Sequence, residues 1–139
     1  METMTTAELQ DFATRYTAAW CSQNPASVAA FFSPSGSLNI NDSPPATGRD
    51  AITAAAQSFM TAFPDLQVIL DELIVAPHAT ATYHWTLLGT NTGPGGTGKR
   101  VHITGFEQWQ FSPDGLIAQS LGHFDAAQYQ HQLLHGIGL

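Results

Sequence analysis

The stretch LGHFDAAQYQHQL (residues 121–133) passes from a strand-like pattern into a helical one, and an aspartate stands at the junction. Apolar and polar residues alternate up to Phe124, as in a half-buried strand, whereas the residues after Asp125 are typical of a helix. An aspartate at this point can cap the helix that follows. The end of a buried strand can also hold a functional carboxylate rigidly. Asp125 therefore has two interpretations, a helix cap and a functional acid.

Upstream of this stretch, the apolar residues recur first at helical and then at strand-like spacing. Leu9, Phe12 and Tyr16 follow a capping box formed by Thr5 and Glu8, which indicates an amphipathic first helix. We predict helices over about residues 5–20, 25–32, 50–63 and 125–135, and strands over residues 37–41, 66–75, 78–88, 100–111 and 116–124. Helices that precede a run of antiparallel strands indicate an α+β fold, with the helices packed on one face of a curved sheet.

The composition favours a single compact domain over residues 1–139, with 43% hydrophobic and only 11% charged residues. The net charge of −7 argues against nucleic acid and anionic membranes as partners. The lone cysteine, Cys21, can form no internal disulfide or zinc cage. The sequence begins without a signal-peptide pattern, and no run approaches the ~18 apolar residues of a membrane span. We therefore expect a soluble, cytoplasmic protein.

The tight turn SPDG (residues 112–115) joins the last two predicted strands, and their register sorts the side chains onto two faces. With Phe111 opposite Leu116, one face carries Gln108, Gln110, Gln119, Leu121, His123 and Asp125, and the other carries Glu107, Trp109, Phe111, Ala118 and Phe124. Either the polar face meets solvent and the apolar face is core, or the polar face lines a pocket under the helices and a second subunit covers the apolar face. The pattern alone favours the first arrangement, because half-solvated antiparallel sheets are the commoner kind.

Several short motifs together resemble the SnoaL-like polyketide cyclases, which belong to the nuclear transport factor 2-like superfamily. The motifs are FPDLQV (63–68), HWTLLGTNTG (84–93), TGKRV (97–101), DGLI (114–117) and Asp125 followed by QL (132–133). The resemblance implies a cone-shaped barrel, in which a curved, mainly antiparallel sheet wraps around N-terminal helices. It also implies a ligand pocket at the open end of the cone and assembly as a homodimer or homotetramer.

The resemblance also implies a site on the polar face. Asp125 takes the position of the general acid/base, His123 lies two residues before it, and Gln108 matches a glutamine of the preceding strand. We therefore expect Asp125 and His123 to be catalytic, and the substrate to be bound by Gln108, Gln110, Phe106, Leu121, Trp85 and Asn39. Glu107 is the rival carboxylate, and the register sets it on the opposite face.

The residues fit chemistry without a metal or an organic cofactor. The glycines of GTNTGPGGTG (89–98) are irregular and indicate a hairpin loop rather than a dinucleotide motif. His131 and His135 lie one helical turn apart but have no third ligand at a suitable spacing. A dry pocket would raise the pKa of Asp125 toward neutrality, where general acid/base catalysis is efficient.

The family resemblance implies intramolecular aldol ring closure, so we expect a polyketide cyclase-type enzyme that acts on a small hydrophobic carbonyl compound. An isomerase, a dehydratase or an epoxide hydrolase with the same cone is the alternative within enzymes. A module that binds a small molecule without turnover is the alternative outside them. The low charge and the apolar sheet face suit a homo-oligomer under each hypothesis.

Overall fold

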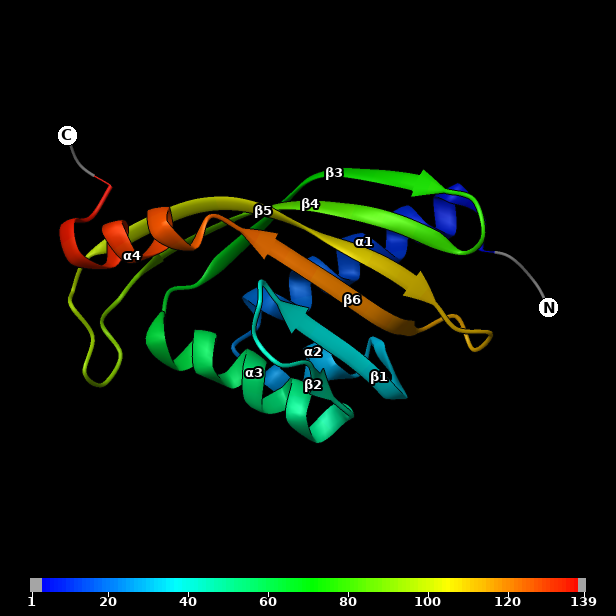
Figure 1. The fold of residues 1–139 in the computed structure, drawn as a ribbon, viewed down its shortest axis with the longest axis horizontal. Helices are drawn as coiled ribbons and strands as arrows, with labels where there is room; N and C mark the ends of the chain where they lie inside the picture. Colours follow the sequence, from blue (N-terminus) through cyan, green and yellow to red (C-terminus); the bar gives the residue numbers. More distant parts are fainter. Residues whose placement is uncertain (1–3, 138–139) are drawn as a thin grey trace.

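The computed structural model describes residues 4–137 and shows one sheet with helices against it (Figure 1). The helices are Thr6–Cys21 (α1), Pro25–Ala29 (α2), Arg49–Ala62 (α3) and Ala126–His135 (α4). The strands are Phe32–Ile40 (β1), Ala46–Thr47 (β2), Gln67–Ala76 (β3), Thr80–Thr90 (β4), Arg100–Phe111 (β5) and Ile117–Phe124 (β6). These elements confirm the predicted α+β fold class. No helix within residues 4–137 has the length and apolar character needed to cross a membrane.

The strands form one six-stranded sheet in the order β2-β1-β6-β5-β4-β3. Neighbouring strands are antiparallel except β1 and β6, which run parallel, so the sheet is mixed. The sheet curves and does not close, because β2 and β3 remain as its two edges (Figure 1). The expected cone is therefore an open, curved sheet, with α1, α2 and α3 packed against one of its sides.

The core lies between α1 and the helix-covered side of the sheet, which we call the inner face. Tyr16 of α1, Tyr83 of β4 and Trp109 of β5 are all buried. The rings of Tyr83 and Trp109 stack with centroids 4.8 Å apart, and Tyr16 meets both edge-on at 5.3 and 5.2 Å. Such pairs add about 0.5–1.5 kcal/mol each beyond the burial of their area. This aromatic cluster fixes α1 over the middle of β4 and β5.

The first strand begins earlier than the sequence predicts. The second helix ends at Ala29, and β1 starts at Phe32, which is buried and pairs with Ile117 of β6. The register shifts just after Phe32, where Pro34 has no N–H to donate to a ladder. A Cβ at Gly36 would lie 2.7 Å from the Ile117 carbonyl oxygen, so glycine permits the close approach. The stretch SPSG (residues 33–36) therefore belongs to an irregular part of β1.

The β5–β6 hairpin has a register different from the predicted one, yet it sorts the side chains in the predicted way. Phe111 pairs with Ile117 rather than with Leu116, and an irregularity follows, so that Gln108 lies opposite Leu121. The irregularity restores the alternation, so Gln108, Gln110, Gln119, Leu121 and His123 share one face while Glu107, Trp109, Phe111 and Phe124 share the other. The helices cover the second of these faces. The expectation that the polar face lies under the helices is therefore wrong, and its glutamines are exposed.

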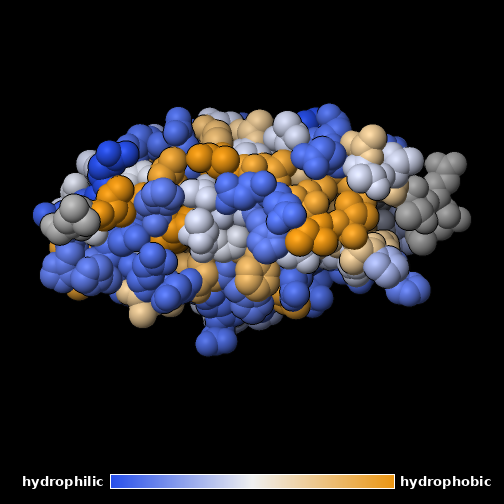
Figure 2. Space-filling view, turned by 90° about the horizontal axis from the view of Figure 1, so that it is seen from above, coloured by the Kyte–Doolittle hydropathy of each residue, from blue (hydrophilic) through white to orange (hydrophobic). Residues whose placement is uncertain are grey.

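Strand β3 forms one edge of the sheet and keeps part of its side chains in solvent. Its exposed apolar residues are Ile69, Ile74 and Val75. Figure 2 views the molecule from the side on which β3 lies in Figure 1 and shows apolar surface interrupted by polar groups. The pairing with β4 shifts at Asp71. The Cys21 sulfur of α1 accepts a hydrogen bond from the Val68 amide at 3.3 Å and donates to the Val68 carbonyl at 3.4 Å.

Candidate active site

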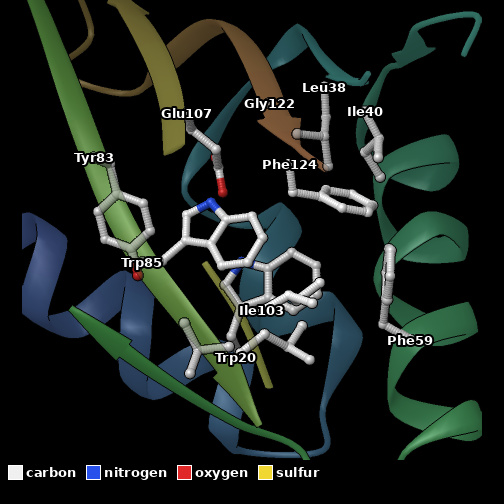
Figure 3. A pocket seen from close by; sticks show the side chains of 12 residues that line it. Trp20, Leu38, Ile40, Phe59, Tyr83, Trp85, Ile103, Glu107, Gly122 and Phe124 are labelled. Carbon is white, nitrogen blue, oxygen red and sulfur yellow. The ribbon is translucent and has the colours of Figure 1, made fainter. Parts of the chain in front are cut away.

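A narrow cavity, the inner pocket, lies between the inner face of the sheet and helices α1 and α3 (Figure 3). Its volume is about 60 Å³, which is room for a few water molecules or one small ligand. It is lined by Trp20, Leu38, Ile40, Phe59, Val68, Tyr83, Trp85, Leu87, Ile103, Glu107, Gly122 and Phe124. Glu107 is the only carboxylic acid in this lining.

Glu107 reaches the inner pocket because of its place in the alternation of β5. It shares the inner face with Trp109 and Phe111, and only 8% of its surface is exposed. Gly122 pairs with it on β6, and a Cβ at Gly122 would come within 3.7 Å of the Glu107 side chain. Such a Cβ would be in ordinary van der Waals contact with Glu107, whose side chain extends into the cavity in Figure 3.

Three donors converge on one oxygen of the Glu107 carboxyl group. Oε1 accepts hydrogen bonds from the Tyr16 hydroxyl at 2.9 Å, the Trp109 indole N–H at 3.0 Å and the Ser120 hydroxyl at 2.7 Å. The other oxygen, Oε2, accepts none from the described residues. The arrangement fixes the carboxyl group through Oε1 and leaves Oε2 available to a molecule in the cavity.

Burial raises the pKa of Glu107, and the three donors oppose this rise without cancelling it. Burial and the nearby Glu107 charge raise the pKa of Tyr16 well above its usual value, so that its hydroxyl keeps the proton that it donates. Tyr83, whose pKa is also raised by burial, pairs with Thr17. Because the Thr17 hydroxyl donates to the Ala13 carbonyl, Tyr83 is the donor in this pair.

Trp85 brings an unpartnered donor to the same cavity. Its indole N–H is buried and has no hydrogen-bond partner among the described residues. Figure 3 shows this nitrogen lying on the side of the ring toward Glu107. The ring has room because residue 105 is glycine, where a Cβ would lie 2.5 Å from the Trp85 six-membered ring. A buried donor without an acceptor costs free energy, so the position suits a ligand oxygen.

The predicted catalytic pair lies elsewhere, in an open depression where β6 passes into α4. This β6-end depression is lined by Asn41, Asp71, Glu72, His84, Trp85, Thr104, Gly105, Phe106, His123, Phe124 and Asp125. Asp125 is exposed, and its side chain accepts a hydrogen bond from the Gln128 amide at 3.0 Å. This geometry confirms the helix-cap interpretation of Asp125. The dry surroundings expected for it are absent, because the chain leaves the sheet here.

The structure brings together some of the other predicted site residues and not the rest. Phe106 and Trp85 line the β6-end depression with His123, and the rings of Phe106 and His123 are 5.1 Å apart. The predicted residues that line neither cavity are Gln108, Gln110, Leu121 and Asn39. They lie on the outer face of the sheet, where strand alternation directs them away from the helices.

The residues of the inner pocket were mostly missing from the predicted site. Of the twelve lining residues, only Trp85 is among the predicted substrate-binding residues, and Glu107 is predicted only as a rival carboxylate. One signal was available in the sequence. Glu107 alternates with Trp109 and Phe111 on a face that is otherwise apolar, and a charged residue on such a face needs partners or a function.

No group of three or more metal-ligating side chains occurs within residues 4–137. The rings of His131 and His135 lie 4.8 Å apart on α4, and no third ligand joins them there.

The fold is shared by solved structures of low sequence identity. One is a protein with a ketosteroid isomerase-like fold from Catenulispora acidiphila DSM 44928, determined with trimethylamine (TM-score 0.75, 15% identity, 85% of this chain and 88% of that chain). Another is a SnoaL-like protein from Jannaschia sp. CCS1 (TM-score 0.80, 15% identity, covering 96% of this chain and 98% of that chain). A third is TsrD from Streptomyces laurentii (TM-score 0.80, 23% identity, covering 94% of this chain and 97% of that chain). A search of curated proteins gives no significant match.

These similarities define the class as α+β proteins with the ketosteroid isomerase-like fold. The sequence adds the family, because residues 10–133 match the SnoaL-like polyketide cyclases. The chain therefore belongs to the SnoaL-like polyketide cyclase family, as the motifs of residues 63–133 indicate.

Proposed function

We propose that the protein is an acid/base enzyme that acts on a small carbonyl compound in the inner pocket. Glu107 is the group that takes and returns the proton. The observation that carries this proposal is the Glu107 carboxyl group, which is buried, held by three donors on Oε1 and open to the cavity at Oε2. Such an arrangement orients a proton-transfer group before the substrate arrives.

The electrostatics of the inner pocket support the same role. Burial raises the pKa of Glu107, which moves a carboxyl group toward the range in which it exchanges protons efficiently at neutral pH. The unpartnered N–H of Trp85 can donate to the carbonyl oxygen of the substrate, where negative charge develops when a neighbouring carbon loses its proton. One group then moves the proton, and the other stabilises the charge.

Removal of a proton beside a carbonyl is the first step both of an aldol ring closure, the reaction that the sequence resemblance implies, and of an isomerisation. We assign this step to Glu107 rather than to Asp125. Asp125 is exposed at the surface and its carboxyl group accepts a helix N–H, so it serves the helix and is not enclosed with a substrate.

The test is deuterium exchange at the carbons beside the carbonyl of small cyclic ketones, followed by proton NMR in D2O. Glu107→Gln retains the shape of the side chain but cannot accept the proton, so we expect the exchange rate to fall by about 10²–10⁴-fold. Asp125→Asn is the matched control and should retain the rate. Equal exchange by wild type and Glu107→Gln would overturn the proposal. A loss confined to Asp125→Asn would transfer the role to Asp125.

A second candidate is binding of a small amine without turnover. Five aromatic side chains line the inner pocket beside one carboxyl group, and aromatic surroundings bind alkylammonium ions. The structure from Catenulispora acidiphila contains trimethylamine. The Trp85 N–H argues against an amine in this chain, because it presents positive charge to the same space.

We further propose that copies of the chain associate through the outer face of β4, β5 and β6. Arg100 and Glu107 are the only charged residues in these strands, and Glu107 points inward. Because each copy has a net charge of −7, a face almost without charge is where two copies meet with the least repulsion. Sedimentation velocity should show an oligomer that Leu121→Asp, on this face and outside the β6-end depression, dissociates. A monomeric wild-type protein would overturn this proposal.

A further inference from the structure

The inner pocket offers very few polar atoms to a ligand. Among its lining side chains, the Tyr83 hydroxyl is already paired with Thr17, and the Trp20 indole is directed at the Tyr16 hydroxyl. Within the part of the chain that the structure describes, Oε2 of Glu107 and the buried N–H of Trp85 have no hydrogen-bond partner. All other side chains that line the cavity are hydrocarbon.

This inventory limits how many oxygen atoms a ligand can bury. One oxygen can accept from the Trp85 N–H while a neighbouring C–H faces Oε2 of Glu107. A second oxygen would lose its water and find no donor, which weakens binding by roughly tenfold or more. A chain with oxygen on every second carbon, as in a polyketide, would bury several such atoms.

We propose that the ligand of the inner pocket is a small neutral ketone with one oxygen and an otherwise hydrocarbon frame. The proposal rests on the proposed function in taking Oε2 of Glu107 as the atom that faces the reacting carbon. The volume of about 60 Å³ accommodates the carbonyl end of such a molecule, since a cavity that encloses a whole benzene ring measures about 150 Å³. This ligand class narrows the small carbonyl compounds of the proposed function to those that place a single oxygen in the cavity.

Charge argues against an ionic ligand. A carboxylate ligand would lie beside the Glu107 carboxyl group in a cavity without a cation, since no Lys or Arg lines it. An ammonium ligand would leave the Trp85 N–H unpartnered and place it against positive charge. A neutral ketone satisfies both groups, because its oxygen accepts from Trp85 and its acidic C–H contacts Glu107.

The reaction that this pair supports is enolisation. The carboxylate Oε2 takes a proton from the carbon beside the carbonyl, and the C–H electron pair becomes a carbon–carbon double bond. The former carbonyl oxygen then carries the negative charge and is held by the Trp85 N–H. The protonated Glu107 exchanges its proton with water, and return of the new proton to carbon then restores the ketone without an oxidant. Ring closure between two carbonyls inside this cavity is not supported, because the second oxygen has no donor.

Three matched rings test the ligand class: cyclohexanone, cyclohexane-1,4-dione and cyclohexylammonium. Binding is measured by ¹H–¹⁵N NMR on the wild-type protein, with the Trp85 indole signal assigned from Trp85→Phe. We expect cyclohexanone to bind about tenfold more tightly than the dione and to move the Trp85 N–H signal downfield, as a new hydrogen bond does. Because the signal is observed in the wild type, the result does not depend on how well Trp85→Phe folds.

The outcomes separate this inference from the proposed function. Equal or tighter binding of the dione or of the ammonium ion overturns the ligand class, as does failure of cyclohexanone to bind or to move the Trp85 signal. Exchange that depends on Glu107 would then still uphold the acid/base role. Preferential binding of cyclohexanone without exchange would uphold the ligand class and overturn the acid/base role.

Discussion

Two carboxyl groups of this protein stand in opposite surroundings, Glu107 in the inner pocket and Asp125 at the start of α4. Glu107 is buried and receives three side-chain donors on one oxygen. Asp125 is exposed and accepts one backbone N–H of the helix that it caps. An acid at the junction of two elements has a structural reason to be there. An acid in the middle of a buried strand has no such structural reason, so its partners or its function must compensate for the free-energy cost of burying it.

The comparison is tested most strongly by removing the Glu107 side chain. Glu107→Ala leaves the Tyr16, Trp109 and Ser120 donors without their acceptor, and each unpaired buried group costs about 1–3 kcal/mol. We expect the free energy of unfolding to fall by about 3 kcal/mol or more, measured by urea denaturation. Glu107→Gln, which retains an oxygen for the donors, is the control and should lose less. A loss below about 1 kcal/mol in Glu107→Ala would show that the network contributes little.

A smaller effect is expected when one donor is removed. Ser120→Ala deletes the 2.7 Å hydrogen bond to Glu107, and we expect a loss of about 1–2 kcal/mol in unfolding free energy. The pKa of Glu107 should rise further, because this donor lowers it in the wild type. Titration of the Glu107 carboxyl carbon by ¹³C NMR measures the change. A pKa that stays the same or falls would contradict the assigned hydrogen bond.

Asp125 should respond as a helix cap does. Asp125→Ala removes the acceptor of the Gln128 N–H, which typically costs about 1 kcal/mol, whereas Asp125→Asn still caps the helix and should be close to wild type. Thermal and urea unfolding of the two variants provide the measurement. If both variants lost stability equally, the charge rather than the cap would be responsible.

The smallest expected effect is the pH dependence that Glu107 contributes to stability. Because burial raises its pKa in the folded state, the folded chain binds this proton more tightly than the unfolded chain. The contribution of Glu107 to stability therefore falls as the pH rises from the unfolded pKa through the folded one, and it is constant below that window. The unfolding free energy of wild type minus that of Glu107→Gln should decrease over this range in urea titrations at several pH values. An increase with pH would reverse the sign of the assigned pKa shift.

Local features of the fold could be predicted from the sequence. The capping box of Thr5 and Glu8, the helix cap at Asp125 and the sorting of the β5–β6 side chains all depend on residues close together in the chain. The sorting survived a wrong register because the irregularity near Phe111 restored the alternation. Alternation shows which side chains share a face. It does not show which face the helices cover, and here the family resemblance favoured the wrong one.

The inner pocket could not be predicted because its parts come from distant segments. The Tyr16 donor is 91 positions from Glu107, and α3 contributes the opposite wall through Phe59. Oε2 of Glu107 and the Trp85 N–H become distinctive only when the packing of the other groups is known. In the sequence, Trp85 and Glu107 are one indole and one carboxylate among several.

The exposed edge of β3 determines how easily another copy of the chain could add a strand to this sheet. An edge strand of ten residues is a template on which another chain can add a strand. Here the register shift at Asp71 interrupts that template with a bulge and a charge, and the Cys21 sulfur occupies the amide and carbonyl of Val68. Because Cys21 is exposed, oxidation of this single thiol would free the Val68 groups for pairing between chains.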